Sequence, residues 1–276
     1  MRASGSAQSG SVKVQGGHLP FETLGEGHPL LLLHADVADR RMWDEQVGAF
    51  AKHYRVIRID KRGFGAAESD DGPYSPRQDI VDVLSSLGIT HTAILGLSNG
   101  GATALDFALE HPKMVDALIV AAGGVSGSPP AATAEEMVLI GHFQALQERQ
   151  DVAGLVELGV RVWADGPNQP VGRAAAPVRE RLRAMLADNY RLHHEQLQPC
   201  ALEPPASGRL GELDVPTLVM IGDLDFSGTI SAMDQLANGV TGAQHVVFAG
   251  AAHMLNMEQP GRFNAVVLAF LREVLS

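Results

Sequence analysis

Cysteine is almost absent from the sequence: Cys200 stands alone among 276 residues. A single cysteine excludes an intrachain disulfide and a cysteine-based zinc site, and it fits a reducing compartment. No stretch approaches the roughly 18 continuous apolar residues of a membrane span. The polar residues 1–11 lack the apolar middle region of a secretory signal. We therefore expect a cytoplasmic protein that begins with a disordered leader, residues 1–11.

Positive charge is also scarce, because 21 Lys and Arg residues stand against 32 Asp and Glu residues, a net charge of −11. Such a surface repels nucleic-acid phosphates and anionic membranes, so neither is an expected partner. Hydrophobic residues make up 45% and charged residues 19% of the chain. This balance is typical of a globular protein and excludes a disordered one. At about 150 residues per domain, the length allows one large or two small domains.

Short apolar runs of strand length alternate with helical stretches along most of the chain. Continuous apolar strands separated by helices are typical of a parallel sheet that is covered on both faces. We therefore predict an α/β fold with a doubly wound, mostly parallel sheet. The predicted strands are 12–15, 18–24, 30–33, 55–59, 92–97, 117–121, 216–221 and 245–248, and the helices between them are 40–52, 76–87, 100–110, 230–238 and 260–275.

The alternation stops between two clusters of Gly, Ser and Pro, at 123–130 and 203–208. Three helices are predicted there without intervening strands, at 133–149, 152–164 and 177–198. Residues 12–124 and 208–276 are therefore predicted to form one α/β core. Residues 125–207 are predicted to be a helical cap, or lid, that is inserted into it.

The sharpest local motif is Gly96-Leu97-Ser98-Asn99-Gly100, which follows a predicted strand and precedes a predicted helix. In a nucleophile elbow the backbone at the serine is strained, and glycines two residues away avoid a collision of side chains. Ser98 would then stand at the edge of the sheet beside a helix N-terminus. An ordinary glycine turn between a strand and a helix is the alternative interpretation of this motif.

A serine nucleophile needs a base, and the base needs a carboxylate that orients it. Two later segments supply these groups: Gly222-Asp-Leu-Asp225 follows a predicted strand, and His253 follows the last one. We predict Ser98, Asp225 and His253 as a catalytic triad, with Asp223 as the competitor of Asp225. Turn formation alone is the better explanation for Asp223.

The triad chemistry also needs two N–H donors for the oxyanion. The residue after the nucleophile, Asn99, supplies one, and the loop after strand 30–33 should supply the other. We assign the second donor to the backbone N–H of Asp36. Its carboxylate would oppose an oxyanion, so it must point away or pair with a cation such as Arg40 or Arg41.

These residues resemble the α/β-hydrolase superfamily over nearly the whole of 12–275. The resemblance rests on the ordered motifs Leu31-Leu-Leu-His34, Met42-Trp43-Asp44, Asp60-Lys-Arg62-Gly-Phe-Gly65, the Ser98 elbow, Gly222-x-x-Asp225 and Gly250-x-x-His253. Within the superfamily, the spacing from His34 to Arg62 is similar to that of 3-oxoadipate enol-lactone hydrolases and related esterases. The resemblance implies a cap over the active site and a reaction that needs neither a metal nor an organic cofactor.

The leading hypothesis is thus a serine hydrolase that cleaves a small carboxylic ester or lactone through an acyl-enzyme. Gly100-Gly-Ala-Thr-Ala-Leu105 is also similar to carbon–carbon bond hydrolases of aromatic degradation, which form the first alternative. A cofactor-free haloperoxidase or perhydrolase would use the same triad. A non-catalytic ligand-binding protein on a hydrolase scaffold is a fourth reading, against which an intact triad argues.

Overall fold

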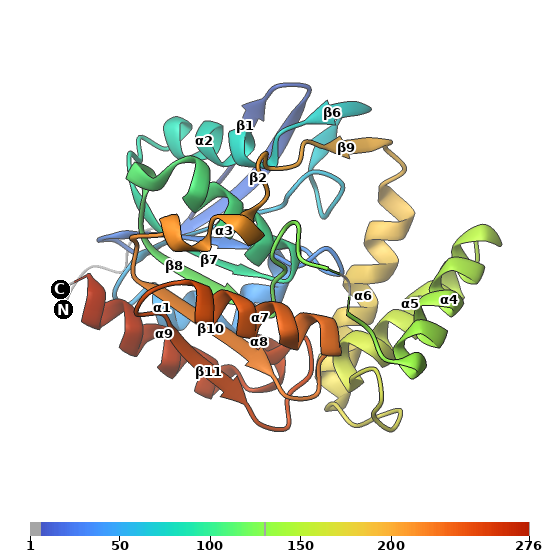
Figure 1. Ribbon diagram of the computed structural model, residues 1–276. Coiled ribbons are helices and arrows are strands. Elements are labelled where there is room, and N and C mark those ends of the chain that lie inside the picture. The colour runs from blue at the N-terminus through green and yellow to red at the C-terminus, as the bar shows by residue number, and fades with distance from the viewer. Residues whose placement is uncertain (1–6, 130, 276) are drawn as a thin grey trace.

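A central sheet organises the computed structural model, which describes residues 7–129 and 131–275. Nine strands form it, in the order β1-β2-β4-β3-β7-β8-β10-β11 with β5 beside β2 (Figure 1). From β4 to β11 in that order neighbours are parallel, and β2 pairs antiparallel with β1, β4 and β5. The strands are β1 (Gln8–Val14), β2 (Gly17–Leu24), β3 (Pro29–Leu33), β4 (Arg55–Ile59), β5 (Glu68–Ser69), β7 (Thr92–Leu97), β8 (Val115–Ala121), β10 (Thr217–Gly222) and β11 (Gln244–Phe248).

Helices cover both faces of this sheet, as predicted (Figure 1). Helices α1 and α9 pack against each other, and α2 and α3 form a second packed pair. Strands β7 and β10 are buried along their whole length, which explains their continuous apolar sequences. The helices of the core are α1 (Asp44–Phe50), α2 (Pro76–Ser86), α3 (Asn99–Glu110), α7 (Ser227–Gly239), α8 (Leu255–Glu258) and α9 (Pro260–Val274), with short turns η1 (Arg40–Trp43), η2 (Pro112–Met114), η4 (Ala206–Gly208) and η5 (Leu210–Glu212). Among the described residues, no helix combines the length and the apolarity needed to cross a bilayer.

The first strand begins earlier than predicted. Residues 8–11, assigned above to a leader, pair with β2 as the start of β1. Their sequence is polar, but strand pairing here uses backbone hydrogen bonds, and Gly10 lies against the ring of Phe21. Residues 1–6 of the predicted leader lie outside the described residues.

The segment 125–207, which we call the cap, contains α4 (Ala134–Glu148), α5 (Val152–Gly159), the π-helical segment η3 (Val160–Asp165) and α6 (Ala176–Leu192). The helix predicted over 177–198 is too long, because α6 ends at Leu192. The end of the predicted range belongs instead to a short strand, β9 (Leu197–Pro199), which pairs with β6 (Gly72–Tyr74) of the core. A partner far away in the sequence therefore decides the conformation of this stretch.

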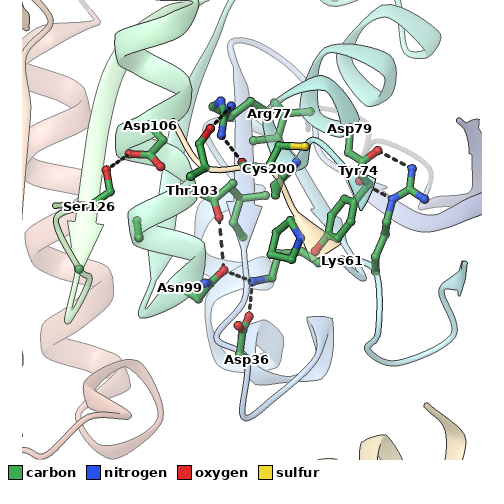
Figure 2. A pocket seen from close by; sticks show the side chains of 18 of the residues that line it. Asp36, Lys61, Tyr74, Arg77, Asp79, Asn99, Thr103, Asp106, Ser126 and Cys200 are labelled. Atoms are coloured by element: carbon green, nitrogen blue, oxygen red, sulfur yellow. Dashed lines mark hydrogen bonds and ion pairs between the residues drawn. The ribbon is translucent and has the colours of Figure 1, made fainter. Parts of the chain in front are cut away.

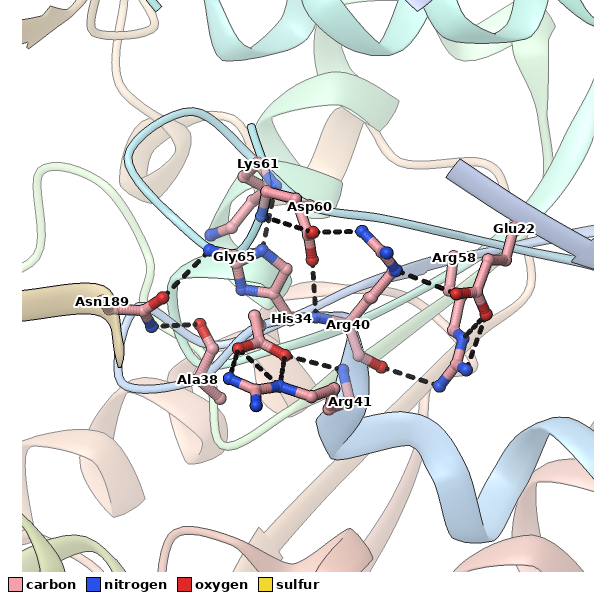
Figure 3. A network of polar contacts seen from close by, with 12 residues as sticks. Glu22, His34, Ala38, Arg40, Arg41, Arg58, Asp60, Lys61, Gly65 and Asn189 are labelled. Atoms are coloured by element: carbon pink, nitrogen blue, oxygen red, sulfur yellow. Dashed lines mark hydrogen bonds and ion pairs between the residues drawn. The ribbon is translucent and has the colours of Figure 1, made fainter. Parts of the chain in front are cut away.

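Polar contacts fasten helix α6 to two loops of the core. Asn189 accepts the Gly65 N–H at 2.9 Å and donates to Ala38 O at 3.1 Å, so one side chain joins both loops (Figure 3). Next to it, Asp188 of α6 lies 2.9 Å from Arg41. The cap is thus held directly above the C-terminal ends of β3 and β4.

Candidate active site

Ser98 forms the sharp turn between β7 and α3. Its backbone has φ 58° and ψ −125°, a conformation that L-residues adopt only under strain and that clusters at functional sites. The Ser98 N–H donates to Ala121 O at 2.9 Å, and Ser98 O accepts from Ala102 N at 3.0 Å. The structure therefore fixes Ser98 at the C-terminal edge of the sheet.

Two glycines permit this turn because each lies against backbone that a side chain would strike. A Cβ on Gly96 would lie 2.1 Å from Gly100 O, and one on Gly100 would lie 2.3 Å from Leu33 O. The same Cβ on Gly100 would be 2.6 Å from His34 O. The N-terminus of α3 is thus pressed onto the loop that follows β3.

His253 and Asp225 come together at the same edge, from the loops after β11 and β10. His253 Nδ1 lies 2.7 Å from Asp225 Oδ2, and both residues are buried. The second oxygen of Asp225 accepts the Phe226 N–H at 2.7 Å, which fixes the carboxylate. A proton held on Nδ1 leaves Nε2 as the basic nitrogen.

The basic nitrogen of His253, Nε2, is buried and makes no hydrogen bond to a described residue. The structure thus joins His253 to Asp225 but forms no hydrogen bond from His253 to Ser98. Catalytic hydrogen bonds are often absent or long in a substrate-free enzyme and form in the complex.

Asp223, the competing carboxylate, has a different contact. Its Oδ1 accepts the Gly250 N–H at 2.7 Å and so braces the loop that carries His253. This contact joins two loops that are far apart in the sequence, so it is neither the local hydrogen bond of a turn nor a bond to His253.

The two residues predicted to bind the oxyanion are linked by one lysine. Lys61 Nζ lies 2.7 Å from Asp36 Oδ1 and 3.1 Å from Asn99 Oδ1 (Figure 2). An ammonium group only donates hydrogen bonds, so the amide oxygen of Asn99 must face Lys61. No hydrogen bond among the described residues uses the Asp36 N–H, and Asn99 is the first residue of α3, where N–H groups lack helical partners.

The carboxylate of Asp36 does pair with a cation, as expected, but this cation is Lys61 and neither Arg40 nor Arg41. Arg40 instead donates to Asp60, and Arg41 pairs with Asp39 at 2.6 Å (Figure 3). Burial raises the pKa of Asp60, although Arg40 and backbone N–H groups oppose the rise. Lys61 was not identified from the sequence, because its pairing depends on how the strand ends meet in space.

An aromatic side chain of the cap packs on the histidine. The centroid of the Trp163 ring lies 4.7 Å from that of His253 and 5.3 Å from that of Phe226. Trp163 belongs to the π-helical segment η3, and π-bulges often occur at functional sites. Sequence analysis missed Trp163 because one tryptophan in a helical stretch carries no signal of its own.

Arg173 joins the cap to the loop of His253. It donates to Gly250 O at 2.8 Å and to Glu258 Oε2 at 2.5 Å. Glu258 Oε1 in turn accepts the Ala252 N–H at 2.7 Å, next to His253. Burial raises the pKa of Glu258, while the Ala252 N–H and Arg173 act in the opposite direction.

Two cavities lie beside Asp36, one of the residues predicted to bind the oxyanion, and Asp36 and Phe64 line both of them. The first has a volume of about 210 Å³ and lies under the cap, against Phe143, Trp163 and other cap side chains. The second has a volume of about 430 Å³ and lies beside α2 and α3 (Figure 2). It is more polar, since its lining includes Lys61, Asn99, Thr103, Asp106 and Ser126.

A family model described as the alpha/beta hydrolase fold matches residues 28–260. The chain belongs to the alpha/beta hydrolase fold family. Among its relatives, 3-oxoadipate enol-lactonase 2 of Acinetobacter baylyi is 27% identical over 271 residues, which cover 92% of this chain and 93% of that protein. A 2-hydroxy-6-oxononadienedioate/2-hydroxy-6-oxononatrienedioate hydrolase of Paraburkholderia phymatum is 29% identical over 260 residues, 88% of this chain and 86% of that one.

Solved structures show the same fold. A thermophilic esterase from Thermogutta terrifontis is similar with a TM-score of 0.77 at 24% identity, and the match covers 98% of this chain and 100% of that one. The chain is thus a hydrolase of the alpha/beta hydrolase fold family, as the sequence motifs indicated.

The two carboxylates of the loop after β10 give a direct test in this alpha/beta hydrolase. Asp225→Asn should lower kcat for a short p-nitrophenyl ester by about 10⁴-fold, because an amide favours the wrong tautomer of His253. Asp223→Asn, the matched control, should lower kcat only a few-fold. Circular dichroism and thermal melting establish that both variants fold. Equal losses, or the larger loss in Asp223→Asn, would contradict the assignment.

His34 gives the alpha/beta hydrolase a specific sensitivity to acid. Its Nδ1 donates to Ala35 O and its Nε2 accepts the Lys61 N–H, so the buried ring is neutral. Burial, assisted by the charge of Lys61, lowers the pKa of His34 to about 3 from its usual 6.5. In the unfolded chain His34 therefore binds a proton below pH 6.5, whereas in the folded chain it binds one only below about pH 3.

The free energy of unfolding should consequently fall by about 1.4 kcal/mol per pH unit below 6.5 on account of His34 alone. The measurement is urea unfolding at neutral pH and near pH 5, for the wild type and for His34→Gln. The amide of the variant can still accept the Lys61 N–H but does not titrate. The variant should lose about 2 kcal/mol less over this range, and identical losses would refute the prediction.

Proposed function

We propose that this hydrolase cleaves a small carboxylic ester or lactone, with Ser98 as nucleophile, His253 as base and Asp225 as its carboxylate partner. Two observations carry the proposal: Ser98 is strained and Asp225 and His253 form a buried pair, and all three residues follow the C-terminal ends of strands of one sheet. The open Nε2 of His253 is the atom that the chemistry requires. The similarity to an enol-lactonase and to an esterase supports the choice of bond.

In the proposed reaction, Ser98 Oγ attacks the carbonyl carbon while its proton passes to His253 Nε2. Asp225 holds the ring and stabilises the imidazolium. The tetrahedral intermediate then breaks its bond to the alkoxide, which takes the proton from His253. His253 next deprotonates a water that attacks the acyl-enzyme, and Ser98 leaves with that proton. In a lactone the alkoxide remains attached to the acyl group.

The negative charge of the tetrahedral oxygen would be bound by the N–H groups of Asn99 and Asp36. The Asp36 carboxylate would oppose this charge if it were unpaired, since two charges a few Å apart interact strongly in a partly buried site. The ammonium of Lys61, whose side chain is 14% exposed, lies between Asp36 and Asn99 and neutralises the carboxylate. We therefore assign Lys61 as a positioning residue of the oxyanion site.

The cavities favour a small ester with one apolar part and one polar part. An apolar group fits the 210 Å³ cavity beside Trp163, and the other group would enter the 430 Å³ cavity beside Asn99. The larger cavity is less suited to the dianionic substrate of a carbon–carbon bond hydrolase, because it offers no unpaired cation among its described lining residues. The cations that line the larger cavity, Lys61, Arg62 and Arg77, are each paired with a carboxylate of the protein.

A covalent probe tests the nucleophile and separates an enzyme from a binding protein. A fluorophosphonate should label the wild type but not Ser98→Ala, and the variant should lose at least about 10³-fold in kcat on short p-nitrophenyl esters. Ser126→Ala is the matched control, because Ser126 lines the larger cavity and bonds Asp106 at 3.1 Å. The control should label normally. An unlabelled wild type, or a folded Ser98→Ala protein with normal kcat, would refute the proposal.

The role of Lys61 is tested by removing its charge. Lys61→Met should lower kcat about 10- to 100-fold with little change in KM, because the unpaired Asp36 carboxylate then opposes the transition-state charge. The double variant Lys61→Met/Asp36→Asn should recover most of this loss, and Lys61→Arg should retain activity. Lys61 would be a purely structural residue if the added Asp36→Asn change gave no recovery or if KM alone changed.

A further inference from the structure

Two histidines and an aspartate gather at the edge of the sheet opposite Ser98. His28 directly precedes β3, His91 directly precedes β7, and Asp116 is the second residue of β8. These three strands are parallel neighbours, so their N-terminal ends meet. Ser98 follows the other end of β7, and the cluster is therefore separated from it by the length of a strand.

A β-bulge places the aspartate. Thr92 of β7 pairs with Val115 of β8 and Ala93 pairs with Ala117, so Asp116 has no partner on β7. Bulges bend a strand locally and redirect the side chain of the extra residue. Here the redirected carboxylate reaches the loops in front of β3 and β7.

The three side chains are spaced as ligands of one metal ion. One ring nitrogen of His28, one ring nitrogen of His91 and a carboxylate oxygen of Asp116 all lie within 4.8 Å of one another. Asp116 Oδ2 is 3.1 Å from His28 Nε2 and 2.5 Å from His91 Nδ1. Ligands around a tetrahedral Zn²⁺ are about 3.3 Å apart. The distance between His28 Nε2 and Asp116 Oδ2 is already close to this value. The distance from His91 Nδ1 to the same oxygen is shorter, and His91, whose side chain is 54% exposed, would move outward when an ion binds.

His28 is available as a ligand. Its Nε2 is buried and makes no hydrogen bond with any described residue, despite the proximity of Asp116. Burial lowers the pKa of His28, with Asp116 opposing and His91 reinforcing the change. A neutral imidazole offers the lone pair that a metal requires. The net charge of −11 also favours a cation at the surface.

We propose that His28, His91 and Asp116 bind a divalent transition-metal ion of the Zn²⁺ class, with water completing the coordination. Two imidazoles and one carboxylate suit Zn²⁺ and Co²⁺, whereas Mg²⁺ and Ca²⁺ prefer oxygen ligands throughout. The ion would cross-link the starts of β3, β7 and β8. It takes no part in the chemistry at Ser98, and the site does not depend on the function proposed above.

An ion that binds only the folded chain stabilises it by mass action. At a free Zn²⁺ concentration one hundred times the Kd, Tm should rise by about 5 °C for a chain of this size. Ester hydrolysis should be the same with and without the ion bound at this site. Mg²⁺ at the same concentration should leave Tm unchanged.

The experiment uses the untagged full chain, stripped of metal, with Cys200→Ser as the background so that a surface thiol does not bind the probe. Zn²⁺ titration by calorimetry should give one ion per chain, and Co²⁺ should give the visible absorption of a tetrahedral site. His91→Ala and Asp116→Ala should each weaken Zn²⁺ binding at least about 100-fold. Far-UV circular dichroism and thermal melting without metal establish that these variants fold.

His245→Ala is the matched control. His245 also lies near a carboxylate, 3.9 Å from Asp234, but no third ligand joins this pair among the described residues. The control should bind Zn²⁺ as the background protein does. The proposal is overturned if Zn²⁺ binds no more tightly than Mg²⁺, or if His91→Ala and Asp116→Ala bind Zn²⁺ as tightly as His245→Ala.

Discussion

The backbone of Gly100 touches the carbonyl oxygens of Leu33 and His34, and the arrangement of the active-site edge depends on this contact. A larger residue would push α3 away from the end of β3. With glycine there, the first turn of α3 lies beside the loop that carries Asp36. In the proposed reaction, Ser98 and Asn99 on one side and Asp36 on the other would face the reacting carbonyl.

The features that sequence analysis predicted are those with local causes. The turn at Ser98 needs glycines at 96 and 100, and the local sequence alone is enough to recognise them. Buried parallel strands such as β7 need apolar residues along their whole length, so the predicted mostly parallel sheet is confirmed. Sequence analysis chose Asp225 over Asp223 because turn formation alone explained Asp223 better, and the hydrogen bond from His253 to Asp225 agrees with that choice.

The features that it missed depend on partners far away along the chain. Asp36 could pair with any nearby cation, and only the meeting of two strand ends selects Lys61. Residues 197–199 follow a helix in sequence but join strand β6 in space. The position of Asp116 results from a bulge between two strands, and no residue pattern marks it. Pairings of this kind are determined by tertiary structure and not by local propensity.

The cap is fastened to the core at several places, among them Asn189 near β3 and β4, Arg173 beside the loop of His253, and strand β9 beside β6. These fastenings constrain how new specificities could arise in this scaffold. A transplanted or redesigned cap would need its own substitute for the guanidinium of Arg173, or it would leave the Glu258 carboxylate buried without its cation. Under the proposed function, substrate preference would therefore change most freely through residues such as Phe143, which line the cavity without fastening the cap.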